Sequence, residues 1–184
     1  MADAHKKNIV FLTGFMGSGK STLAPLLANS IGYAFIDLDA EIEKRLGKTI
    51  NRIFQEDGEQ HFRSAEHAIL TELQPRDHCV VSLGGGTIAH HNNIQLIKSL
   101  GILIYLKARP EKLLKRLRYK TDRPLLRTDK DKSPDDLELK ERIDHLLTSR
   151  EPFYRQADIV VFTDDKPVAY TVDDLVKRIR HLVD

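Results

Sequence analysis

The chain has 184 residues, of which 41% are hydrophobic and 30% are charged, and its formal net charge is +2. This is an ordinary composition for a soluble globular protein, and the length suits one α/β domain that buries roughly 70% of its unfolded surface. The near balance of charge gives no support for a dedicated nucleic-acid surface. No apolar run approaches the ~20 residues of a membrane span, and the polar segment 1–7 has no signal-peptide core.

The chain has a single cysteine, Cys79, so an intramolecular disulfide is excluded and the reducing cytosol is favoured. We therefore expect a cytoplasmic protein without membrane or nucleic-acid partners. Cys79 opens an apolar run and is expected to pack in the core. The sequence contains no internal repeat, low-complexity tract or interdomain linker, which predicts one domain over residues 1–184.

The first predicted strand, residues 8–13, continues into Gly14-Phe15-Met16-Gly17-Ser18-Gly19-Lys20-Ser21 and then into a helix over residues 20–31. In such a unit, glycines bring backbone N–H groups close to phosphate oxygens, and the helix N-terminus adds positive charge. Lys20 can reach the β- and γ-phosphates of a nucleotide, and the Ser21 hydroxyl can ligate Mg²⁺. The alternative is a glycine turn that only joins strand to helix, but every fixed position of the pattern is filled. The predicted phosphate-binding residues are Gly14, Gly17, Ser18, Gly19, Lys20, Ser21 and Thr22.

Two aspartates, Asp37 and Asp39, follow the second predicted strand, residues 33–36. Ligands bind beyond the carboxyl ends of parallel strands, so both carboxylates are expected at the same edge as the glycine loop. One could hold a Mg²⁺-bound water while the other meets a substrate hydroxyl. The alternative is that Asp39 only caps the helix predicted over residues 40–46. The presence of a pair at this edge favours the functional interpretation.

Helices are predicted over residues 49–57 and 59–73, and the second carries Arg63 and Glu66 at a spacing that allows them to pair on the helix surface. Taken alone, Arg63 is predicted to be a solvated surface residue. The third strand, residues 79–83, is followed at once by Gly84-Gly85-Gly86. Three glycines at the ligand edge indicate a close approach of the backbone to another group, with a loose turn as the alternative.

A polar and charged segment over residues 119–134 lies between the helices predicted over residues 110–118 and 135–149. Its length, and arginines at positions 116, 118, 123 and 127, favour a mobile lid that closes on phosphate over an ordinary linker. Pro152 is expected to begin a short separate turn, and Thr171 and Asp174 have capping-box spacing. The other predicted elements are strands over residues 102–106 and 158–163 and helices over residues 92–100, 110–118, 135–149 and 171–183.

Five short apolar strands that alternate with helices predict an α/β fold with a doubly wound parallel sheet. This pattern alone identifies an enzyme that uses ATP or GTP through a phosphate-binding loop, with phosphoryl transfer as the favoured chemistry.

Six stretches, in this order and spacing, resemble the shikimate kinase family, and the resemblance extends over residues 8–183. The glycine loop alone is shared by many kinases, whereas the combination is highly specific. The stretches are Gly14 to Ser21, Asp37 to Asp39, the run of Ile53 through Glu59 with Phe62 to Glu66, Gly84 to Gly86, Asp122 to Leu126, and Arg150 to Tyr154.

The resemblance implies a three-layer fold with a five-stranded parallel sheet of order 2-3-1-4-5 and substrate-binding helices over about residues 39–73. It implies transfer of the γ-phosphate of ATP, with Mg²⁺, to the 3-hydroxyl of shikimate in the chorismate and aromatic amino-acid pathway. A monomer is also implied.

Residue by residue, the resemblance implies that Asp39 binds the shikimate hydroxyls and acts as the base or helps to position it. Asp37 would hold a water on Mg²⁺. Arg63, oriented by Glu66, and Arg150 would clamp the shikimate carboxylate.

The resemblance also assigns the backbone of Gly85 and Gly86 to the substrate. Arg123 would touch both the substrate and the transferring phosphate, which makes Lys20, Asp39 and Arg123 the implied catalytic residues. Arg116 and Pro167 would flank the adenine.

Two other classes are weighed against this one. A gluconate kinase-like enzyme would share the loop and lid, but has no evident need for the aspartate pair, Arg63 and the triple glycine together. A non-catalytic nucleotide-binding module would be expected to lose Lys20, Asp39 or Arg123, and all three are present.

Overall fold

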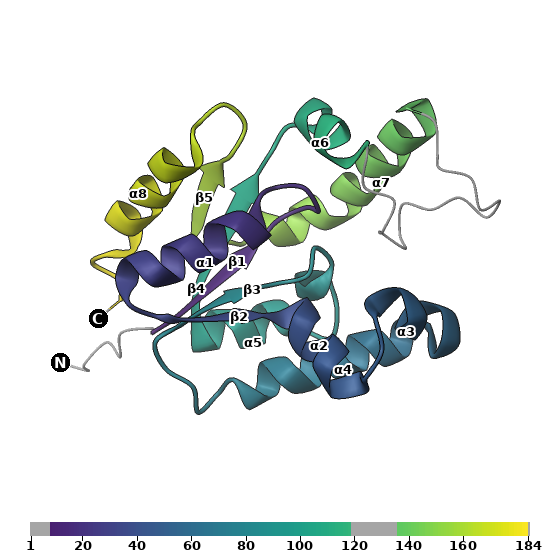
Figure 1. The fold of residues 1–184 in the computed structure, drawn as a ribbon, viewed down its shortest axis with the longest axis horizontal. Coiled ribbons are helices and arrows are strands. Elements are labelled where there is room, and N and C mark those ends of the chain that lie inside the picture. Colours follow the sequence, from purple (N-terminus) through teal and green to yellow (C-terminus); the bar gives the residue numbers. More distant parts are fainter. Residues whose placement is uncertain (1–7, 119–135, 184) are drawn as a thin grey trace.

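The structure is a computed structural model that describes residues 8–118 and 136–183. The predicted lid over residues 119–134, with Arg123, lies outside the described residues. The described chain forms a central sheet covered by helices on both faces (Figure 1). No helix within it combines the length and the apolar character needed to cross a membrane.

The sheet has five parallel strands in the order β2-β3-β1-β4-β5, which confirms the predicted order. In the central register, Ile9 lies between Cys79 on one neighbour and Gly101 on the other. The strands are β1 (Ile9–Thr13), β2 (Ala34–Asp37), β3 (Cys79–Ser82), β4 (Gly101–Lys107) and β5 (Ile159–Phe162).

Alternate residues of the strands supply two hydrophobic clusters, one on each face of the sheet, because successive strand side chains point to opposite faces. Val10 and Leu12 pack with α1 (Lys20–Ile31) and α8 (Val168–Ile179). Phe11 packs in the other cluster with α4 (Gly58–Glu72) and α5 (Asn93–Leu100). Cys79 lies in this second cluster with 1% exposure, which confirms its predicted core role, and burial raises the pKa of its thiol.

A smaller group of helices extends beyond the sheet at the edge where β2 ends (Figure 1). It consists of α2 (Leu38–Leu46), α3 (Ile50–Glu56) and the first half of α4. Thr49 caps α3 by accepting a hydrogen bond from the backbone N–H of Arg52 at 3.4 Å. After β3 the chain makes a short 3-10 turn, η1 (Thr87–Ala89).

A second pair of helices packs together beside the glycine loop. It consists of α6 (Pro110–Leu117) and α7 (Asp136–Tyr154). Phe15 of the glycine loop lies in the same cluster as Leu113 of α6 and Ile143 of α7, so this pair of helices is fixed to the loop by apolar contact.

The predicted boundaries of two helices are wrong. The helix predicted to end at Ser149 continues as α7 through Pro152 to Tyr154, because Tyr105 of β4 donates to Glu151 and stacks on Tyr154, and so holds the last turn despite the missing proline N–H. The last helix runs over Val168–Ile179 and not over residues 171–183, with Pro167 at the N-cap position. Thr171 lies inside the first turn and donates to the Pro167 carbonyl at 3.2 Å, so the predicted capping box is absent.

Candidate functional site

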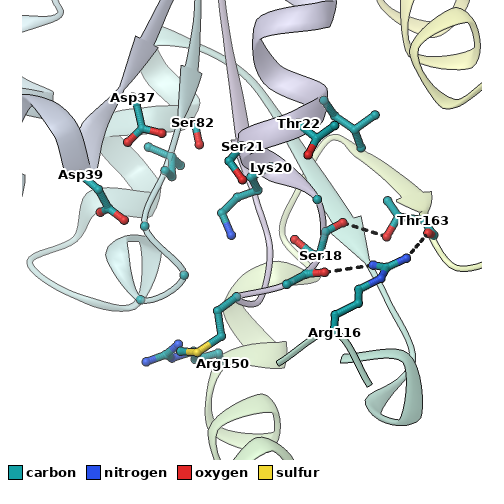
Figure 2. Close-up of a pocket in the computed structure, with 18 of the residues that line it drawn as sticks. Ser18, Lys20, Ser21, Thr22, Asp37, Asp39, Ser82, Arg116, Arg150 and Thr163 are labelled. Atoms are coloured by element: carbon teal, nitrogen blue, oxygen red, sulfur yellow. Dashed lines mark hydrogen bonds between the residues drawn. The ribbon is translucent and has the colours of Figure 1, made fainter. Parts of the chain in front are cut away.

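A cavity of about 520 Å³ opens at the carboxyl ends of the central strands, beside the start of α1. It brings together residues from the glycine loop, the end of β2, α4, the loop after β3, α6 and α7 (Figure 2). The predicted site residues that line it are Gly17, Ser18, Gly19, Lys20, Ser21, Thr22, Asp37, Asp39, Arg63, Gly85, Gly86, Arg116 and Arg150.

The glycine loop has a backbone that only glycine adopts without strain. Gly14, Gly17 and Gly19 have φ values of +146°, +80° and +106°. A Cβ on Gly14 would lie 2.5 Å from the Leu106 carbonyl oxygen, so this glycine lets the loop pack on β4. The Lys20 ammonium lies over its own loop, donating to the carbonyls of Gly14 at 2.6 Å and Phe15 at 3.2 Å. The N-terminal end of α1 faces the cavity, as anion binding requires.

Three side-chain hydrogen bonds tie this loop to the end of β5. Arg116 donates to the carbonyl of Gly17 at 3.0 Å and to the carbonyl of Thr163 at 2.8 Å, and the Thr163 hydroxyl donates to the Ser18 carbonyl at 2.9 Å (Figure 2). Thr163 was not singled out by the sequence, although its place at the carboxyl end of a parallel strand is the signal that could have found it. Pro167 stands at the N-cap of α8, and its neighbours Lys166 and Val168 line the cavity.

Oxygen-bearing side chains lie across the cavity from the loop. Figure 2 shows Asp37 and Asp39 to the left of Lys20 and Ser21, with Ser82 between them. An Asp37 carboxylate oxygen accepts from the backbone N–H of Ala40 at 3.2 Å and so caps α2. The alternative that Asp39 caps this helix is therefore wrong, and Asp39 lies in the first turn of α2 and lines the cavity.

The donor set around the loop suits a hard divalent cation. Hydroxyl and carboxylate oxygens from Ser21 and Asp37 border the same cavity. Mg²⁺ binds through one or two protein groups together with phosphate oxygens and waters, so it needs no closed protein cage. Within residues 8–118 and 136–183 there is no group of three or more His, Cys, Asp or Glu side chains that could hold a metal alone. The residues present therefore fit a nucleotide-bound Mg²⁺.

Arg63 is 4% exposed, so the prediction of a solvated surface residue is wrong. The expected pairing with Glu66 is present, with Nη1 donating to Oε2 at 2.6 Å, but the pair is buried and Glu66 is 0% exposed. The guanidinium also donates to Glu59 and packs 5.0 Å from the centre of the Phe62 ring. Burial raises the pKa of Glu66, while Arg63 and the donating Thr87 hydroxyl act in the opposite direction.

Arg150 is 7% exposed and lies near the floor of the cavity, 5.8 Å from the centre of the Phe15 ring. Its Nη1 atom is buried and has no hydrogen-bond partner among the described residues. A buried cationic donor with no partner is costly, and an anion in the cavity would supply one. Arg150 is therefore a candidate for binding an anion in the cavity.

The triple glycine passes between these two arginines. A Cβ on Gly86 would lie 2.9 Å from Nη2 of Arg63, and a Cβ on Gly85 would lie 3.5 Å from Nη1 of Arg150 and 3.4 Å from the Gly14 carbonyl oxygen. A Cβ at Gly86 would collide with the buried Arg63 guanidinium, whereas one at Gly85 would make ordinary contacts, so the close approach that the sequence predicted is present at Gly86.

The glycine loop at the start of α1 faces a cavity that two arginines and an aspartate pair also line. The fold and this cavity define a small-molecule kinase of the phosphate-binding-loop class. The family model described as "Shikimate kinase" matches residues 16–180. The chain belongs to the shikimate kinase family.

Sequence relatives and solved structures agree with this assignment. The chain is 52% identical over 176 residues to a shikimate kinase of Chlorobaculum tepidum, covering 95% of this chain and 92% of the relative. It is 32% identical to a solved shikimate kinase from Acinetobacter baumannii in complex with shikimate, with a TM-score of 0.85 and coverage of 95% and 93%. A gluconokinase from Sinorhizobium meliloti, with 19% identity over 97% of this chain and 94% of its own and a TM-score of 0.60, shares the fold alone.

Proposed function

We propose that this protein transfers the γ-phosphate of ATP to the 3-hydroxyl of shikimate, giving ADP and shikimate 3-phosphate in the chorismate and aromatic amino-acid pathway. The observation that carries the proposal is the convergence of two buried guanidinium groups, Arg63 and Arg150, on the glycine turn after β3, in one cavity with the phosphate-binding loop. Membership of the family supports the same conclusion.

The acceptor half of the cavity suits a small carboxylate that carries hydroxyl groups. Planar guanidinium groups bind a carboxylate with paired hydrogen bonds, so we assign the shikimate carboxylate to Arg63 and Arg150. The backbone of Gly85 and Gly86 lines the same part of the cavity. Asp39 would bind the shikimate hydroxyls from the opposite side and act as the base or position it.

The donor half of the cavity suits the nucleotide. Backbone N–H groups of Gly17, Ser18 and Gly19, with Ser21 and Thr22, would surround the phosphates, and Lys20 would turn from its own loop to the β- and γ-phosphates. Bound Mg²⁺ would supply charge neutralisation for the transferring phosphoryl group. The Ser21 hydroxyl would ligate the ion and Asp37 would hold one of its waters.

Three further assignments rest on the family resemblance. Arg123 would reach both substrate and phosphate from the predicted lid, and Arg116 and Pro167 would flank the adenine. Arg116 is already fixed beside the phosphate-binding loop by its bonds to Gly17 and Thr163. We also propose a single-domain cytoplasmic monomer without nucleic-acid or membrane partners.

The position of the phosphate on the product tests the proposed reaction. After incubation of the protein with Mg²⁺, ATP and shikimate, the phosphorus nuclear magnetic resonance spectrum of the product should show coupling to the proton on carbon 3. Coupling to another ring proton would contradict the assignment of the reacting hydroxyl. A phosphorylated product only with gluconate would favour the gluconate kinase alternative, and no product with either would favour a non-catalytic module.

Replacement of Asp39 by asparagine should lower kcat by about 10²-fold to 10³-fold, because the change removes the charge that orients or activates the acceptor hydroxyl. The melting temperature should change by little, since Asp37 and not Asp39 caps α2. Steady-state kinetics and thermal unfolding measure the two effects. Asp173→Asn, on the exposed face of α8, is the matched control. Wild-type turnover in the Asp39→Asn protein would reject the role of Asp39.

A further inference from the structure

We infer that Tyr154 is a positioning residue for the acceptor, which acts through Gly85 and Arg150 by fixing the glycine turn to the last turn of α7. The inference rests on the proposed function, since it assumes that this end of the cavity binds shikimate. Tyr154 does not line the cavity itself.

The Tyr154 side chain is fully buried, and its hydroxyl donates a hydrogen bond to the carbonyl of Gly85. The carbonyls on either side of Gly85 have partners within the turn itself, since Gly84 accepts from the N–H of Thr87 and Gly86 from that of Ala89. The middle carbonyl of the glycine turn is therefore held by a side chain from a distant helix. Loss of that donor would leave this partly buried acceptor without its side-chain partner.

Tyr154 and Arg150 are four residues apart on α7, one helical turn, so they lie on the same side of the helix. The Arg150 guanidinium also meets the glycine turn, at 3.5 Å from the position of a Gly85 Cβ. The Tyr154 hydroxyl thus connects the helix that carries one arginine with the backbone against which that arginine packs. Its bond sets the distance between Arg150 and the glycine turn.

The last turn of α7 is anchored to β4 by a second set of contacts, which makes Tyr154 a fixed support. The Tyr154 ring stacks on the Tyr105 ring with centroids 4.7 Å apart. The Tyr105 hydroxyl donates to Glu151 at 2.8 Å, and the Lys107 ammonium donates to the other oxygen of Glu151 at 2.6 Å. Burial raises the pKa of Tyr154 to about 12, so its hydroxyl keeps the donated proton over the neutral range.

The test is Tyr154→Phe, which keeps the ring and its stacking and removes only the hydroxyl. We expect the KM for shikimate to rise about tenfold, the effect of losing about 1.4 kcal/mol of binding free energy, with kcat and the KM for ATP within about twofold of wild type. Tyr33→Phe is the matched control, because Tyr33 is also buried but packs against α1 and α8 on the other face of the sheet. It should leave both KM values unchanged.

Thermal unfolding of both variants separates positioning from folding. A Tyr154→Phe protein whose two KM values rise together, or whose shikimate KM matches wild type, would overturn the inference. An equal rise of the shikimate KM in the Tyr33→Phe protein would also overturn it, since any lost buried hydroxyl would then have the same effect. The comparison is made against wild-type shikimate-dependent turnover, so absence of that turnover would reject the proposed function and not the role of Tyr154 specifically.

Discussion

Replacement of Lys20 by alanine should lower kcat by about 10³-fold or more, the effect expected when a cationic donor to a transferring phosphoryl group is lost. Lys20 begins α1 and its ammonium lies over the carbonyls of Gly14 and Phe15, within the loop that faces the cavity. Phosphoryl transfer depends on positioning and charge neutralisation, so loss of this charge should slow the chemical step.

Initial rates of ADP formation at saturating ATP and shikimate measure the effect of Lys20→Ala. The control is Lys177→Ala, which removes an exposed lysine on α8 away from the cavity and should retain wild-type turnover. The melting temperature of both proteins should stay near wild type. A Lys20→Ala protein with near-normal kcat would remove the phosphate-binding role from the loop.

Replacement of Arg63 by alanine should have two separable effects, because this side chain serves both the acceptor and the fold. Loss of a buried charged partner should weaken shikimate binding by about 2–5 kcal/mol, with ATP binding unchanged. The same change leaves the fully buried Glu66 without its ion-pair partner, and breaking such a pair costs about 3–5 kcal/mol of folding free energy.

A double variant, Arg63→Ala with Glu66→Gln, separates the two effects. Glutamine can still accept from the Thr87 hydroxyl but carries no charge, so the double variant should recover part of the free energy of unfolding and none of the shikimate affinity. Isothermal titration with shikimate and with ATP, and urea unfolding, provide the measurements. Equal losses of shikimate and ATP affinity in Arg63→Ala would reject the acceptor clamp.

The stability loss of Arg63→Ala should also depend on pH in a defined direction. Burial raises the pKa of Glu66 above its value in the unfolded chain, and removal of Arg63 takes away an opposing influence. In the folded Arg63→Ala protein, Glu66 then binds a proton more readily than it does in the unfolded chain. The loss of unfolding free energy is therefore largest above the raised pKa of Glu66, and it shrinks as the pH falls. The double variant with glutamine should lack this dependence.

The sheet and the glycine loop were predictable because their signals are local. Val10 and Leu12 pack on one face of the sheet and Phe11 on the other, as strand geometry requires, and the loop has a fixed spacing of glycines. The strand order itself followed from the resemblance to the family. The structure confirms this order, since the five strands pair as β2-β3-β1-β4-β5.

The errors arose where distant contacts decide the outcome. The spacing of Arg63 and Glu66 indicated that the two side chains pair. It did not indicate that the pair is buried, with the Thr87 hydroxyl bonded to Glu66 and the Phe62 ring packed against Arg63. The persistence of α7 beyond Pro152 depends on contacts with β4 that no local pattern reports. For the same reason Tyr154 was missed as a support of the site.

The cap of α2 shows a different limit of sequence reasoning. Capping rules favour aspartate before a helix, but Asp37 and Asp39 both satisfy them, and a shift of the helix start by two residues exchanges their roles. The structure starts the helix at Leu38 and gives the cap to Asp37. Asp39 then lies in the first turn of α2 and lines the cavity.

The most direct test of the central claim is acceptor-dependent release of ADP from Mg²⁺-ATP, measured in parallel with shikimate and with gluconate. The proposed function predicts rapid ADP release with shikimate and only background release with gluconate or without acceptor. Release with gluconate alone, or no acceptor-dependent release by a protein that binds ATP, would contradict it.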